Sequence, residues 1–256
     1  MEKKVRRRVR RRVQEKARLV DETTPFAITE AFDQLRTNIM YTPHDAEGCP
    51  VYGVTSAEMS VGKSTITANL ALSFAQLGKK VLLVDADMRR PTQHKIFELG
   101  KENNGLSELL SEIANDDAAL IKRPHENLNI ITSGAIPPNP SALMLGKKIG
   151  KLINKWKNEY DIVFIDLPPV GMVTDPITIS EHISGYVMVA TINKSDARHV
   201  NDAIDAVEQV GAKIIGLVIN GINPKGEGYR YSKNGYKYEY RYGYYANTED
   251  TDTDKK

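Results

Sequence analysis

The sequence predicts an α/β fold of three layers, in which helices cover both faces of a mainly parallel sheet. Six short apolar segments rich in Val and Ile alternate with amphipathic segments along residues 51–220. Strands buried on both faces form continuous apolar runs, and strands that alternate with helices pair in parallel. The chain has 256 residues, 41% hydrophobic and 27% charged, which is typical of a globular protein with a sizeable core.

The predicted elements follow from these patterns in chain order. The predicted strands are residues 51–56, 80–85, 128–132, 161–166, 186–192 and 214–220. Residues 63–77 and 196–210 predict helices, each stopped by a following glycine. The apolar faces of these two helices consist of Ile66, Leu70, Phe74 and Leu77, and of Val200, Ile204, Val207 and Val210.

Composition divides the chain into three regions. Residues 1–25 are a basic arm, because residues 1–18 carry ten Lys or Arg against two Glu, whereas the whole chain has a formal charge of only +2. Residues 26–223 are the folded body, which is mildly acidic. Residues 224–256 are a tail rich in Tyr, Gly and charge, without apolar periodicity. We expect this tail to be disordered or loosely ordered on its own.

Several classes of protein are excluded by composition. No apolar run approaches the ~18 to 20 residues that span a bilayer, so the sequence excludes an integral membrane protein. The charged start lacks the apolar segment of a secretory signal. A single cysteine, Cys49, cannot form an internal disulfide, which fits a reducing compartment. We therefore expect a cytoplasmic protein.

A phosphate-binding loop follows the first predicted strand. It consists of Ala57, Glu58, Met59, Ser60, Val61, Gly62, Lys63, Ser64 and Thr65, with Ala in place of the usual first Gly. Gly62 lets the backbone approach an anion, and the helix that follows presents unpaired N–H groups to phosphates. Lys63 would contact the β- and γ-phosphates, and the Ser64 hydroxyl would bind Mg²⁺. The strand–loop–helix context predicts a P-loop NTPase fold that binds ATP and Mg²⁺, rather than an ordinary Ser-capped helix.

Two further strands end in carboxylates. Asp85 and Asp87 close the second predicted strand and share one side if the chain stays extended. Asp166 follows an apolar run, as in the second magnesium motif of P-loop enzymes. Because ligands bind at the carboxyl ends of parallel strands, we expect these side chains near Lys63, where they would hold Mg²⁺ or accept a proton. Helix capping by the Asp pair and simple strand termination at Asp166 are the alternatives.

Together these segments resemble the bacterial protein-tyrosine kinases, P-loop enzymes that control capsule and exopolysaccharide synthesis. The resemblance extends over about residues 26–223 and the tail. The matching stretches are residues 55–56, 62–65, 69–71, 84–91, 137–141, 161–170 and 173–175. Arg89-Arg90-Pro91 and the Pro-Pro-Asn-Pro of residues 137–140 are more specific than the phosphate loop itself. Related partitioning and division-site ATPases usually carry a Lys where this chain has Glu58, which favours the kinase branch.

The resemblance implies an ATP- and Mg²⁺-dependent tyrosine kinase and assigns roles to the acidic residues. Lys63, Asp85 and Asp87 would be catalytic, with Asp85 as the base or orienting group for the tyrosine hydroxyl. Ser64, Asp87 and Asp166 would serve the metal.

Three more residues are candidate contacts to substrate. Arg89 and Arg90 would help to bind phosphate or the acceptor. Asn220, at the end of the last predicted strand, is a candidate for the adenine contact. These assignments complete the expected nucleotide and acceptor sites.

The tail supplies a reachable substrate, since it holds eight of the twelve tyrosines of the chain. They are Tyr229, Tyr231, Tyr236, Tyr238, Tyr240, Tyr242, Tyr244 and Tyr245. In the family that the chain resembles, such a cluster is the autophosphorylation site, and each phosphate would add roughly −1.5 to −2 charge. A Gly/Tyr tail without modification, or a nucleic-acid-binding segment in which Arg and Lys alternate with aromatics, are the alternatives.

The helix before the first strand departs from the family pattern. Family members assemble rings through a Glu-x-x-Arg-x-x-Arg motif, and here Glu30 and Arg36 are kept while Asp33 replaces the middle Arg. We therefore expect a homo-oligomer with an altered subunit contact. Members without transmembrane segments work with a membrane polysaccharide co-polymerase whose cytoplasmic tail activates them, so the resemblance implies such a partner here.

The role of the basic arm is open. Val5, Val9 and Val13 would form an apolar stripe on a cationic helix, which favours recruitment to an anionic inner membrane surface at about 1 kcal/mol per Lys or Arg. Nucleic acid and a merely solvated tail are the other interpretations. Two other functions are also open for the whole chain, a partitioning-type ATPase switch that binds DNA or membrane and a degenerate kinase that acts as a scaffold.

Overall fold

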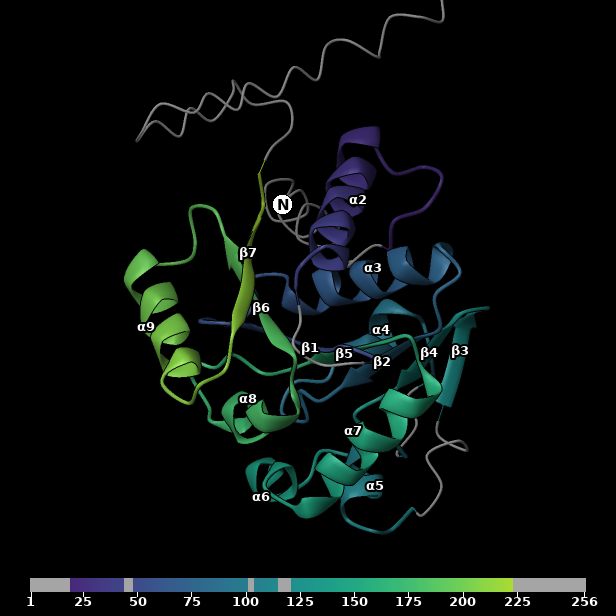
Figure 1. The fold of residues 1–256 in the computed structure, drawn as a ribbon, viewed down its shortest axis with the longest axis vertical. Coiled ribbons are helices and arrows are strands. Elements are labelled where there is room, and N and C mark those ends of the chain that lie inside the picture. Colours follow the sequence, from purple (N-terminus) through teal and green to yellow (C-terminus); the bar gives the residue numbers. More distant parts are fainter. Residues whose placement is uncertain (1–18, 44–47, 101–103, 115–120, 223–256) are drawn as a thin grey trace, which may run out of the picture.

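In this computed structural model, the described residues form a sheet of seven strands, in the order β3-β4-β2-β5-β1-β6-β7 (Figure 1). The structure describes residues 19–43, 48–100, 104–114 and 121–222. Every neighbouring pair of strands is parallel except β3 and β4, which are antiparallel. The predicted fold class, a mainly parallel sheet in an α/β protein, is confirmed.

The six predicted strands are confirmed with ends that differ by no more than one residue. They are β1 (Val51–Ser56), β2 (Val81–Asp85), β4 (Leu128–Ile131), β5 (Ile162–Asp166), β6 (Gly185–Thr191) and β7 (Ile214–Asn220). The seventh, β3 (Ile121–His125), is not predicted by the apolar pattern because it contains Pro124 and charged residues. A proline is tolerated there because β3 lies at the edge of the sheet, where one missing N–H donor breaks no ladder.

The helices are α2 (Phe26–Met40), α3 (Lys63–Gln76), α4 (Gln93–Ile96), α5 (Leu106–Leu110), α6 (Pro140–Met144), α7 (Lys147–Glu159), α8 (Asp175–Thr178) and α9 (Ala197–Glu208), with a short 3₁₀ turn at Ser180–His182. The two predicted helices correspond to α3 and α9. Their last expected core residues are wrong, since Leu77 is 50% and Val210 is 48% exposed. Both lie past the helix ends, where the chain reverses through left-handed Gly78 and Gly211.

Each face of the sheet carries its own hydrophobic core. In β2, Val81 and Leu83 pack with residues of α3, whereas Leu82 and Val84 pack with α7. This alternation follows from the two-residue period of a strand. Figure 1 shows α2 and α3 above the sheet, α5 to α8 below it, and α9 beside β6 and β7.

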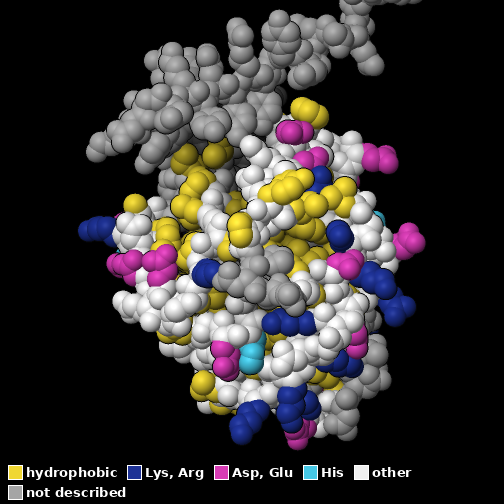
Figure 2. All heavy atoms as spheres, viewed as in Figure 1, with side chains coloured by type: hydrophobic (Ala, Val, Ile, Leu, Met, Phe, Trp, Pro, Cys, Tyr) yellow, Lys and Arg dark blue, Asp and Glu magenta, His cyan; other side chains and the backbone are white. Residues whose placement is uncertain are grey.

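Helix α7 shows how the outer layer meets solvent. Its inward stripe includes Ile153 and Trp156, which are fully buried. Its outward positions are largely lysines, and Figure 2 shows Lys and Arg side chains over this part of the molecule. Among the described ranges, no helix combines the length and apolar character that a bilayer-crossing segment requires.

Strand order places the candidate site. The carboxyl ends of β2, β5 and β1 are neighbours, and Asp85 pairs with Asp166 in the register of β2 and β5. The phosphate loop leaves β1 immediately beside them. Residues far apart in sequence therefore meet at one edge of the sheet.

Candidate active site

The phosphate loop of residues 57–62 joins β1 to α3, which begins at Lys63. Gly62, before the helix, has φ 91°, and Ser60 has φ 59°. A Cβ at Gly62 would overlap the Asn220 side chain, so both backbone conformation and space require glycine. Left-handed residues in such a loop curl successive N–H groups into an anion-binding concavity in front of the helix N-terminus.

Lys63 lies among the acidic residues at the strand ends. Its Nζ is 2.5 Å from Asp166 Oδ1 and 3.7 Å from Asp87 Oδ2. The same Nζ is 3.3 Å from Ser64 Oγ. All three charged side chains are buried, which makes the pairing necessary because an uncompensated buried charge is strongly destabilising.

Asp85 has a different environment from its neighbour Asp87. Its Oδ2 accepts hydrogen bonds of 3.0 Å from the backbone N–H groups of Thr92 and Gln93, at the start of α4. Burial, followed by the charge of Asp166, raises the pKa of Asp85 to about 8. Asp85 thus caps the next helix, which is the helix-capping alternative named in the sequence analysis. Its other oxygen, Oδ1, has no hydrogen-bond partner among the described residues.

Gln93 is a site residue that the sequence patterns do not reveal. Its Nε2 donates to Asp166 Oδ2 at 2.8 Å and to the Ser64 carbonyl at 3.1 Å, and the side chain is fully buried. Its amide thereby links the phosphate loop to the end of β5. Its only sequence signal is its position just after Arg89-Arg90-Pro91.

The donor set fits Mg²⁺ bound together with a nucleotide. Within the described ranges, no group of three or more His, Cys, Asp or Glu side chains would hold a metal ion by itself. Mg²⁺ in phosphoryl-transfer sites characteristically uses one or two carboxylates, phosphate oxygens and water. Ser64, Asp87 and Asp166 would supply the protein's share, and buried Asp85 Oδ1 and Gln93 Oε1 are further oxygens without a partner in the described chain.

Three of the sequence stretches that carry the family resemblance meet at Arg89. Its Nε donates to Asp175 Oδ2 at 3.0 Å, and its Nη2 donates to Ser141 Oγ at 2.8 Å. Ser141 Oγ in turn donates to the buried Asp175 at 2.5 Å. Arg89 is thus engaged within the fold, whereas Arg90 is exposed and its backbone N–H donates to Asp87 Oδ1 at 3.0 Å.

Asn220 lies against the phosphate loop, where its Nδ2 donates to the Val61 carbonyl at 3.0 Å. Its contact with adenine stays a prediction. The eight tail tyrosines and the basic arm of residues 1–18 lie outside the described residues.

Comparisons with known proteins find a matching family and several similar relatives. The ParA family, described as "NUBPL iron-transfer P-loop NTPase", matches residues 50–225. Tyrosine-protein kinase YwqD of Bacillus subtilis (strain 168) is 37% identical over 194 residues, which are 75% of this chain and 81% of YwqD.

Two solved structures are similar as well. The chimerical protein CapA2B2 has a TM-score of 0.72 and 37% identity, covering 79% of this chain and 91% of that one. The kinase domain of Escherichia coli tyrosine kinase ETK has a TM-score of 0.72 and 30% identity, covering 81% of this chain and 80% of that one.

Proposed function

The chain belongs to the bacterial protein-tyrosine kinases within the P-loop NTPases, and on this premise we propose that it phosphorylates its own C-terminal tyrosine cluster. The reaction transfers the γ-phosphoryl group of ATP to tyrosine in capsule or exopolysaccharide synthesis. The observation that carries the proposal is the meeting of Lys63 with Asp87 and Asp166 behind the phosphate loop.

Phosphoryl transfer in such a site depends on positioning and charge. Bound Mg²⁺ would neutralise charge on the β- and γ-phosphates, held by Ser64, Asp87 and Asp166. Lys63 would add a point charge to the phosphates. Gln93 donates to Asp166 and so orients that carboxylate at the end of β5.

The acceptor side of the proposal involves Asp85 and Arg90. We assign Asp85 the role of base or orienting group for the tyrosine hydroxyl, since one oxygen is anchored on α4 and the other has no partner in the described chain. Arg90 is exposed, and its backbone N–H donates to Asp87, so its guanidinium suits contact with phosphate or with the acceptor segment.

We also propose the organisation of the chain around this site. Residues 26–223 would be the catalytic body, residues 224–256 the substrate tail and residues 1–25 an arm for an anionic membrane surface. A membrane co-polymerase with a cytoplasmic tail would be the activating partner, and a homo-oligomer would bring one tail to a neighbour's site.

The test is intact-mass analysis after incubation with Mg-ATP, followed by mapping of the tail peptide. We expect steps of about 80 Da, one phosphate each, located between Tyr229 and Tyr245. Lys63→Ala should lose nearly all of this phosphorylation, because its charge acts on the transferred group. Lys151→Ala, an exposed lysine on α7, is the matched control and should retain it.

Each other outcome has a distinct meaning. Phosphorylation of Lys63→Ala at the wild-type level would overturn the site assignment. ATP hydrolysis that DNA stimulates, without phosphotyrosine, would indicate a partitioning-type switch. ATP binding without hydrolysis or transfer, even with an activator fragment, would indicate a degenerate scaffold.

A further inference from the structure

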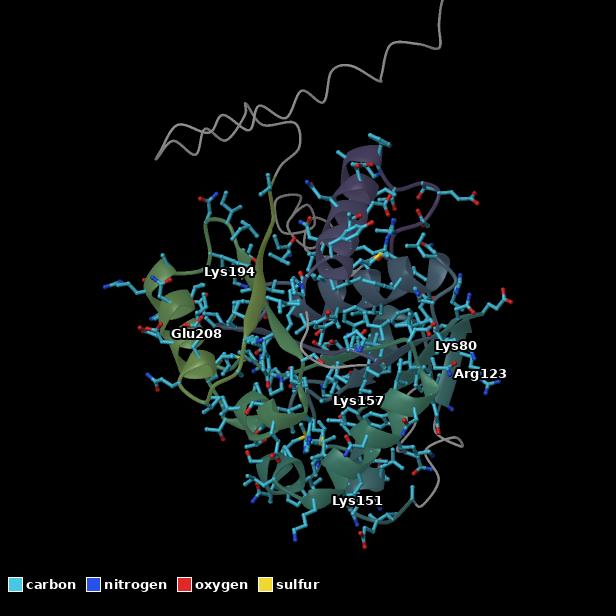
Figure 3. All side chains as sticks on the ribbon, viewed as in Figure 1. Lys80, Arg123, Lys151, Lys157, Lys194 and Glu208 are labelled. Carbon is cyan, nitrogen blue, oxygen red and sulfur yellow. The ribbon has the colours of Figure 1, made fainter. Side chains whose placement is uncertain are left out.

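Two carbonyl groups of the phosphate loop are held by side chains from the β6–α9–β7 part of the fold. The Val61 carbonyl accepts hydrogen bonds from Thr191 Oγ1 at 2.6 Å and from Asn220 Nδ2 at 3.0 Å. The Ser60 carbonyl accepts one from Lys194 Nζ, and Figure 3 labels this lysine between β6 and α9. These contacts join the loop to segments more than a hundred residues away in the chain.

Thr191 and Asn220 are neighbours on two paired strands. They are opposite each other in the register of β6 and β7, at the carboxyl ends of both strands. The Asn220 amide is also held at its other end, where Oδ1 accepts from the Gly221 N–H at 2.8 Å. Both side chains are therefore presented to the loop by the paired ends of two strands.

The direction of these hydrogen bonds determines where the loop N–H groups point. A trans peptide is planar, so its C=O and its N–H point in opposite directions. Drawing the Val61 carbonyl toward Thr191 and Asn220 turns the Gly62 N–H away from β6 and β7. Drawing the Ser60 carbonyl toward Lys194 does the same for the Val61 N–H, and P-loops bind phosphate with such successive N–H groups.

The start of the loop is tied to the same part of the fold. Glu58 Oε1 lies 2.9 Å from His199 Nδ1 and accepts from the Asp196 N–H at 3.5 Å, at the start of α9. Glu58 stands where related ATPases carry a loop lysine. In this chain the Glu58 carboxylate contacts the start of α9 instead.

We propose that Thr191 and Asn220 are positioning residues that orient the Val61–Gly62 peptide of the phosphate loop for binding of a polyphosphate. This inference rests on the proposed function only in taking a nucleotide polyphosphate as the ligand. It assigns Asn220 to the loop instead of to adenine, because its Nδ2 donates to the Val61 carbonyl and its Oδ1 already accepts from the Gly221 N–H.

The test uses Mg²⁺-tripolyphosphate, which has no base, and Mg-ATP, each titrated into the full chain by calorimetry. Thr191→Val keeps the side-chain shape and removes one donor to the Val61 carbonyl. We expect it to weaken both ligands by the same factor, about 3- to 10-fold for one hydrogen bond. Thr191→Ser keeps the hydroxyl and should bind both ligands as the wild type does. Thr37→Val is the control and should also bind as the wild type does, because the hydroxyl that it removes donates to the Asp33 carbonyl within α2.

Asn220→Ala separates the two roles of that residue. Equal weakening of tripolyphosphate and ATP supports positioning of the loop. Weakening of ATP alone would show contact with the base and overturn the assignment. Wild-type affinity of Thr191→Val for both ligands, with or without a lower melting temperature, would also overturn it.

The same measurements keep this inference apart from the proposed function. Normal binding by Thr191→Val in a chain that phosphorylates its tail defeats the inference alone. Weakened binding by Thr191→Val in a chain that transfers no phosphate supports the inference and defeats the proposed function.

Discussion

Gln93 is buried between two parts of the candidate active site, and its amide donates to both the Asp166 carboxylate and the Ser64 carbonyl. Hydrogen bonds to charged groups contribute more than those between neutral groups, because the ionised partner is otherwise unsolvated. We expect Gln93→Leu to lower the free energy of unfolding by about 1–3 kcal/mol. Urea unfolding followed by the fluorescence of Trp156, the single tryptophan, measures this.

The matched control is Gln76→Leu, at the exposed end of α3. An exposed position away from polar networks should change stability by no more than about 0.5 kcal/mol. Equal effects of the two substitutions would mean that the contacts of Gln93 add nothing to stability.

The Glu58–His199 pair predicts a pH dependence at the phosphate loop. The hydrogen bond from His199 lowers the pKa of Glu58, and the same contact, with Asp196 and Asp202 nearby, raises the pKa of His199. A raised histidine pKa stabilises the fold below its ordinary value of 6.5, and this contribution is lost as pH rises through the raised value. The lowered pKa of Glu58 acts in the acidic range. Its contribution to stability is present above the ordinary pKa of a glutamate and is lost as pH falls through the lowered pKa.

An NMR titration of the His199 ring measures this coupling. In Glu58→Gln we expect the pKa of His199 to fall toward 6.5. Asp202→Asn is the control and should lower the pKa of His199 less, because the charge of Asp202 contributes least to the raised pKa of His199. An unchanged His199 pKa in Glu58→Gln would contradict the pairing.

The Cys49 thiol is buried at the start of β1. Burial, and secondarily the charge of Asp161, raises its pKa to about 12. Since the thiolate is the reactive form, we expect negligible modification by a thiol reagent in the native chain and one thiol per chain in urea. Rapid reaction of the native protein would mean that β1 opens at this end.

Among the elements, α7 gives the clearest separation between packing and surface. Ile153 is fully buried against the sheet, whereas its neighbour Asn154 is exposed. We expect Ile153→Ala to destabilise the protein by about 2–5 kcal/mol through lost burial and a residual cavity. Asn154→Ala should have an effect below about 0.5 kcal/mol, with both measured by urea unfolding. Similar losses at both positions would contradict the observed face of α7.

For the whole molecule, the departure at Asp33 bears on the homo-oligomer that we propose. Asp33 Oδ1 pairs with Arg36 Nη1 at 2.6 Å within α2, and the same guanidinium reaches the Ser73 carbonyl of α3 at 3.4 Å. Arg36 is therefore directed into its own chain. We expect Asp33→Arg to free Arg36 and to shift the chain toward larger assemblies, measured by light scattering.

Glu208→Arg is the control for this charge reversal, because Glu208 is exposed on α9, which lies away from α2 (Figures 1 and 3). It should leave the assembly state unchanged. A shift in both variants would indicate a general charge effect, and no shift in Asp33→Arg would remove Asp33 from the subunit contact.

Local patterns were enough for the fold class and for the position of the phosphate loop. Strands buried on both faces must be apolar along their length, and a helix must stop where a left-handed glycine follows, as at Gly78 and Gly211. The loop needs glycine and lysine at set spacings, so Gly62 and Lys63 are visible in the chain itself. Strand β3 was not predicted, because a strand at the edge of a sheet does not need a continuous apolar sequence and tolerates proline.

Contacts between distant segments depend on strand order, which no local pattern contains. The order β3-β4-β2-β5-β1-β6-β7 brings Asp166 to Lys63, turns Asp85 toward α4 and sets Thr191 and Asn220 against Val61. Gln93 and the engagement of Arg89 by Asp175 follow from how the loops after β2 and β5 pack together. Residue type and spacing are encoded locally, whereas the partner of each buried polar group is selected only when the strand ends converge.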